Sequence, residues 1–114
     1  MNGVVTAARE AAAAARCQVA IAQRWRYEAV AMSPGPKAAL RRAVEALGVE
    51  PTELASGAGH DAAIMALAGV PSAMLFVHSD AGGVSHAPEE LSGSDAVALG
   101  VQALEAALRE LAGA

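Results

Sequence analysis

The sequence predicts an α/β fold, and three observations support this prediction. From Pro36 onward the patterns follow the order helix, short extended piece, helix, strand, long loop, helix. The continuous apolar run AMLFV at 73–77, bounded by sequences that break structure, is typical of a strand buried on both faces of a sheet. The segment before Pro36 adds one more helix and one more strand, which we expect to belong to a separate unit.

The N-terminal segment is predicted to form that helix and strand. Residues 4–16 include TAAREAAAAAR, and alanine is the best helix former. Residues 17–27 read CQVAIAQRWRY, where the side chains on one face recur with a period of two, as in a strand. The sequence SPGP at 33–36 breaks the chain. We therefore expect one unit over 1–33 and a second over 34–114.

The remaining helices are predicted from their start and stop signals and from apolar spacing. Pro36 suits the first turn of a helix that ends at Gly48. The apolar stripe of this helix consists of Leu40, Val44 and Leu47. A short helix is predicted at about 60–68, and Ser94 can cap the last helix. The predicted buried stripe of the last helix consists of Val97, Val101, Leu104, Leu108 and Leu111.

Composition excludes several classes of function. The chain has a net charge of -4, no basic stripe, and one Trp, one Tyr and one Phe, so a nucleic-acid partner is not expected. No apolar run approaches the length of a membrane span, and the first residues lack the pattern of a signal peptide. The single cysteine, Cys17, cannot form an internal disulfide, which fits a reducing compartment. We therefore expect a cytoplasmic protein that binds neither nucleic acid nor membrane.

Two loops carry the residues that could perform chemistry, and the first is SGAGHDA at 56–62. Gly57 and Gly59 let the backbone come close to a ligand, and His60 and Asp61 add a polar pair at the start of a helix. Read from its local pattern alone, the loop is better explained as an ordinary glycine turn. In that interpretation Asp61 serves the helix dipole.

The second loop is GGVSHAPEE at 82–90, which follows the strand predicted at 73–77. Ligands of open α/β sheets bind beyond the carboxyl ends of strands, and His86 lies in that region. A neutral imidazole is the commonest metal ligand, and Glu89 or Glu90 could orient its second nitrogen. One histidine is no metal signature, since a zinc site needs at least three protein ligands. A solvent-exposed loop histidine is therefore the alternative.

Together the two loops resemble the end of the family of carbamoylases, ureidopropionases and allantoate amidohydrolases, which are relatives of zinc-dependent aminoacylases and exopeptidases. The family pattern reads SGAGHDA, FVPS and G-[IV]-SHSP-x-E, and this chain reads SGAGHDA, FVHS and GVSHAPEE. His78 stands where the family usually has proline, and Ala87 stands where it usually has serine.

The resemblance covers 36–112 well and 4–27 more loosely. It implies that 34–114 is the C-terminal part of a zinc-peptidase-like catalytic domain, hence part of a three-layer α/β sandwich. It also implies that 1–33 is a remnant of a lid or dimerisation domain, of which it would supply the last helix and strand.

The resemblance also implies roles for individual residues. In such enzymes two divalent metal ions, zinc or manganese, activate a water molecule that attacks the carbonyl carbon of a linear amide or ureido group. His86 matches the last metal ligand, and His60 matches a histidine beside the substrate's ureido group, which it helps to polarise. Glu90 matches the glutamate of the second motif, which supports the metal ligand, and Asp61 matches a residue that supports its own loop. The backbone that lines the substrate pocket is matched by Gly57, Ala58 and Gly59.

Most of the family's site has no counterpart in this chain. The first metal-binding His, the bridging Asp, the Glu general base, a further ligand, and the Asn and Arg that hold the substrate carboxylate all lie upstream in such proteins. We therefore expect part of a hydrolase of N-carbamoyl amino acids or allantoate, inactive alone, that forms a homodimer or binds a complementing chain. The alternative is a noncatalytic interaction module derived from such an enzyme.

Overall fold

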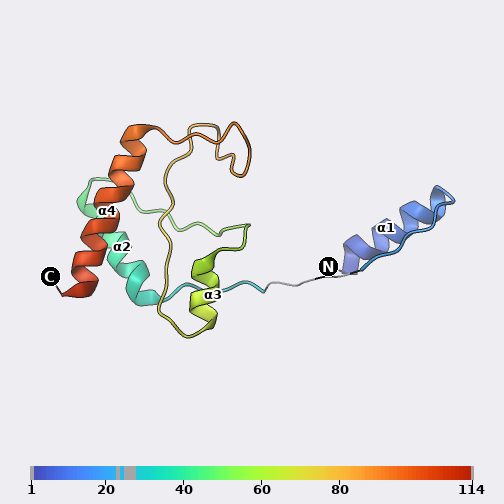
Figure 1. Cartoon of the computed structure of the whole chain (residues 1–114), viewed down its shortest axis with the longest axis horizontal. Coiled ribbons are helices and arrows are strands. Elements are labelled where there is room, and N and C mark those ends of the chain that lie inside the picture. Colours follow the sequence, from blue (N-terminus) through green and yellow to red (C-terminus); the bar gives the residue numbers. More distant parts are fainter. Residues whose placement is uncertain (1, 23, 25–27, 114) are drawn as a thin grey trace.

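The computed structural model describes residues 2–22, 24 and 28–113, and four helices are present in them. Figure 1 shows α1 lying apart from the other three helices, in a molecule with extents of 64 × 34 × 20 Å. The helices are α1 (Asn2–Ala14), α2 (Pro34–Ala46), α3 (Asp61–Leu67) and α4 (Ser94–Ala112).

These helices confirm the four that the sequence predicts, and their ends follow from local chemistry. α2 begins at Pro34, two residues before the predicted start, because Ser33 takes an extended conformation and proline fits the first helical turn. α2 ends before Gly48, whose φ of +77° is a left-handed conformation that glycine adopts without strain. Gly113 ends α4 in the same way, with a φ of +71°.

The core lies between α2 and α4, which are the only two helices of the described chain that pack on each other. Its buried side chains are all alanines spaced four residues apart, which places each pair on one face of its helix. These residues are Ala39, Ala43, Ala103 and Ala107. The predicted stripe of α2 is confirmed, since its three side chains and Leu75 pack around this core. Small side chains let the two helices approach closely.

The predicted buried stripe of α4 is wrong in this structure. Its side chains keep between 44% and 60% of their surface exposed. The exposed residues are Val97, Val101, Leu104, Leu108 and Leu111. The physical reason is that α4 turns its alanine face toward α2, where Ala103 and Ala107 are 3% and 2% exposed. The larger stripe then faces away from the core.

The predicted strand at 73–77 is not formed either, and the described residues contain no strand. The segment is held near its start, where the Ser33 amide donates to the Ser72 carbonyl at 2.8 Å and the Ser72 amide donates to Ser33 Oγ at 3.0 Å. A strand requires a neighbouring chain to complete its hydrogen-bond ladder. No such neighbour lies beside it in the described residues, so the expected α/β layer is absent there.

The strand predicted at 17–27 is absent from residues 17–22 and 24, while residues 23 and 25–27 lie outside the described residues. Residues 17–22 and 24 are exposed to solvent. The proposed division into 1–33 and 34–114 stays a prediction.

Candidate functional site

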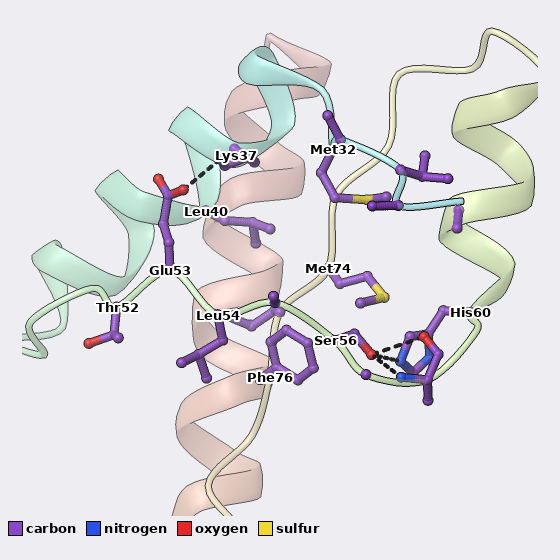
Figure 2. A pocket seen from close by; sticks show the side chains of 18 of the residues that line it. Met32, Lys37, Leu40, Thr52, Glu53, Leu54, Ser56, His60, Met74 and Phe76 are labelled. Carbon is purple, nitrogen blue, oxygen red and sulfur yellow. Dashed lines mark hydrogen bonds and ion pairs between the residues drawn. The ribbon is translucent and has the colours of Figure 1, made fainter. Parts of the chain in front are cut away.

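The loop at 56–60 is organised by the side chain of Ser56 (Figure 2). Ser56 Oγ lies 2.7 Å from Nε2 of His60. The same oxygen donates to the Ala58 carbonyl at 3.1 Å and accepts the Ala58 amide at 3.2 Å. His60 precedes α3 in an extended conformation, and its carbonyl accepts the Ala63 amide at 2.9 Å. The start of the helix therefore holds the backbone of His60, and the serine holds its imidazole.

This loop lies along an open hollow of about 1630 Å³. The four residues predicted to bind substrate all line it, namely Gly57, Ala58, Gly59 and His60, and so does Asp61, which was predicted to support the loop. Figure 2 shows that α2 and the extended segment after α3 also contribute side chains to this hollow, among them Leu40, Met74 and Phe76. The hollow therefore joins a glycine-rich loop to apolar side chains from two other segments.

The charged groups of α2 at the hollow pair with Glu53. Lys37 Nζ and Arg41 donate to the two Glu53 carboxylate oxygens, each at 2.6 Å. The hydrogen bond from Lys37, followed by that from Arg41, holds the pKa of Glu53 below its ordinary value. Glu53 thus stays ionised near neutral pH and engages both cations. It also ties the segment before the loop to α2.

The second loop holds His86 in a defined backbone conformation. Its φ of +59° lies in the left-handed region, which is uncommon for a residue with a side chain. The His86 amide donates to Glu90 Oε2 at 2.8 Å, and Nδ1 lies 2.9 Å from Ser85 Oγ. Glu90 therefore supports the backbone of His86, and the ring is oriented by Ser85 instead of by a glutamate. In the described part of the chain, Nε2 is left without a hydrogen-bond partner.

The two predicted histidines do not meet in one pocket. His60 and His78 line the hollow, whereas His86 and Glu90 are absent from its walls. His78 also pairs with Asp80, with 3.6 Å between His78 Nε2 and Asp80 Oδ1.

The comparisons with known proteins fit the two loops. The sequence profile named Peptidase family M20/M25/M40 matches residues 3–110. The chain belongs to this family. It is also similar to the allantoate amidohydrolase of Bacillus subtilis (strain 168), with 41% identity over 87 residues, which is 76% of this chain and 21% of that protein. The chain thus spans about a fifth of the length of this curated relative. No solved structure gave a significant match.

The described residues do not fit a complete metal site of an M20-type hydrolase. Nowhere in them do three His, Cys, Asp or Glu side chains come together as a metal would require. A zinc site needs at least three protein ligands, and His86 supplies one imidazole.

Among the described residues, no helix is long and apolar enough to cross a membrane.

Two residues of the M20-family loops were missed by the sequence analysis. Ser56 and Ser85 each contact a predicted functional histidine, although neither was selected as a site residue. Their spacing in the sequence could have indicated these contacts, since Ser56 lies four residues before His60 and Ser85 directly precedes His86. A serine at such short range can reach the ring of a neighbouring histidine through a local hydrogen bond.

Proposed function

We propose that this chain is the C-terminal part of a metal-dependent hydrolase of linear amide or ureido C–N bonds. The proposed substrate class is N-carbamoyl amino acids or allantoate. Family membership over residues 3–110 and the similarity to an allantoate amidohydrolase support this proposal. The structural observation that carries it is His86, whose ring is held through Nδ1 while Nε2 remains for a ligand.

In this proposal His86 contributes one ligand to a site for two divalent ions, zinc or manganese, and other parts of the complete protein contribute the rest. His60 binds the ureido or amide group from the wall of the hollow, beside the backbone of Gly57 and Gly59. A zinc site needs at least three protein ligands, and the described residues gather no such set. We therefore propose that the isolated chain is inactive.

The complete fold follows from the same proposal. The run at 73–77 becomes a strand of a three-layer α/β sandwich once neighbouring strands pair with it, and 1–33 belongs to a lid or dimerisation domain. We propose the cytoplasm as its location. Phe76 and Val77, which are 45% and 40% exposed here, would be covered by the adjacent layers.

A second candidate is a noncatalytic interaction module that dimerises or binds a complementing chain. The exposed stripe of α4 favours it, since five large apolar side chains on one helix face favour association. In the first candidate, His60 and His86 are needed for turnover by the complete enzyme. In the second candidate, the chain supplies no residue that takes part in catalysis.

A chimera tests the proposed hydrolase directly. The 87 residues that align with the Bacillus subtilis protein would replace their counterparts in that enzyme, and hydrolysis of allantoate and of N-carbamoyl amino acids would be measured. We expect turnover by the chimera and none by the isolated chain. We expect His86→Asn to abolish it, because asparagine tolerates the left-handed backbone but removes the imidazole.

The matched control is His78→Ala in the same chimera. This substitution also removes one imidazole, but from a residue that pairs with Asp80. Because His78 also lines the hollow, metal content is the readout of this control, and it should stay close to that of the parent chimera. A folded chimera that binds metal normally without His86, or that turns over normally without it, contradicts the proposed role.

A further inference from the structure

We propose that Ser56 is a positioning residue for His60: it keeps a proton on Nε2 and leaves Nδ1 to contact the substrate. This inference rests on the proposed function, in which His60 contacts an amide or ureido group. Neither the family match nor the sequence pattern assigns a role to Ser56.

The first step is the set of contacts that Ser56 Oγ makes. Three polar groups surround this oxygen: the Ala58 carbonyl at 3.1 Å, the Ala58 amide at 3.2 Å and His60 Nε2 at 2.7 Å. Figure 2 shows these contacts converging on the one oxygen at the turn before α3. A hydroxyl has one proton to donate and two lone pairs to accept with, so it can satisfy three partners.

The second step assigns the protons. The Ala58 carbonyl can only accept, so it takes the hydroxyl proton of Ser56. The Ala58 amide can only donate, so it occupies one lone pair. All three contacts are satisfied together only if Nε2 of His60 carries a proton and donates it to the remaining lone pair. Any arrangement with a bare Nε2 leaves two acceptors competing for one hydroxyl proton.

The third step is the consequence for ligand binding. With Nε2 committed to Ser56, Nδ1 is the ring nitrogen of His60 that remains for a ligand. In the neutral ring Nδ1 accepts the N–H of an amide or ureido group, and in the doubly protonated ring it donates to the carbonyl oxygen. Ser56 thereby fixes both the ring orientation and the atom that faces the substrate.

Nitrogen NMR of the intact 114-residue chain tests the assignment. The three histidines give separate ring signals, and their two-bond couplings identify the protonated nitrogen of each. We expect a protonated Nε2 in His60 with a proton signal protected from water exchange. That signal should be lost in Ser56→Ala and should return in Ser56→Thr, which restores the hydroxyl.

Ser85→Ala is the matched control, because it removes the serine that contacts the ring of His86. It should change the ring signals of His86 and leave those of His60 unchanged. The proposal is overturned if His60 carries its proton on Nδ1, or if Ser56→Ala leaves its ring signals as they are. Retention of the far-ultraviolet circular dichroism spectrum establishes that each variant is folded. Should Ser56→Ala unfold, the wild-type proton assignment and the Ser56→Thr spectrum still decide the outcome.

A ligand titration separates this inference from the proposed function. N-carbamoylglycine added to the chimera that keeps Ser56 should shift the NMR signal of His60 Nδ1. In the same chimera, Ser56→Ala should raise KM more than it lowers kcat. If the Nε2 proton is lost in Ser56→Ala but the ligand shifts no signal of His60, the positioning contact stands and the proposed substrate role fails. If the ligand shifts Nδ1 equally with and without Ser56, the positioning role fails and the proposed function stands.

Discussion

Gly100 in α4 lies directly against Val77 of the extended segment that precedes the second loop. A Cβ atom at Gly100 would come within 2.9 Å of Val77 Cγ2. Such a distance is too short for two carbon atoms without a shift of one of them. The glycine therefore lets the extended segment cross α4 closely, next to the alanine core.

A double-mutant cycle measures this contact. Gly100→Ala gains about 1 kcal/mol of helix propensity, but the clash with Val77 offsets it by an overpacking cost of about 1–3 kcal/mol. In a Val77→Ala background the clash is removed, so the same substitution should stabilise the chain. Urea unfolding of the four proteins gives the coupling energy.

Gly35→Ala is the control for that cycle, since nothing lies within 4 Å of its Cβ position. Its effect should be the same with and without Val77. A Gly100→Ala variant that is equally stabilised in both backgrounds contradicts the contact.

The alanine core predicts a second pair of variants. Ala107→Leu places a large side chain where 2% of the residue is exposed, between α4 and α2. Overpacking should destabilise the chain by about 1–3 kcal/mol. Ala106→Leu adds the same side chain at the adjacent, exposed position of α4 and should change stability by less than about 0.5 kcal/mol. Chemical unfolding compares the two, and equal effects would show that α4 does not turn its alanine face toward α2.

The ion pair between Arg42 and Glu110 joins α2 to α4 and predicts a dependence of stability on acid. The hydrogen bond from Arg42 holds the pKa of Glu110 below its ordinary value of 4.5. A carboxyl with a lowered folded-state pKa stabilises the fold above that ordinary value and loses this contribution as the pH falls through the lowered one. Stability should therefore decrease as the pH falls below 4.5.

Glu110→Gln should flatten part of that decrease, which unfolding curves at several pH values would detect. The effect is small because both side chains are exposed to solvent. Glu105→Gln is the matched control, since it removes a pair with Arg109 inside α4 instead of one between helices. Equal flattening by the two variants would argue against the interhelical pair.

The backbone of His86 predicts which substitutions its loop accepts. At a φ of +59°, His86→Asn should be tolerated, whereas His86→Val should cost about 1–2 kcal/mol because a β-branched residue is strained in the left-handed region. Thermal unfolding of the two variants checks the difference. Equal stability would mean that the loop readily leaves this conformation.

Local sequence determined the helices of this protein. Alanine content, Pro34 and the glycines at 48 and 113 set their positions within about two residues, because these signals act over one helical turn. The two histidine loops were also found from the sequence, since SGAGHDA and GVSHAPEE are contiguous sequence motifs. The family profile that spans both is consistent with this.

The tertiary structure decided which faces and side chains meet. The sequence indicated that the larger apolar stripe of α4 would be buried, yet packing selected Ala103 and Ala107, because small residues allow closer contact with α2. The run at 73–77 has the composition of a strand, but a strand depends on a partner distant in sequence. Likewise, residue types marked His60 and His86, whereas only three-dimensional geometry revealed that Ser56 and Ser85 hold their rings.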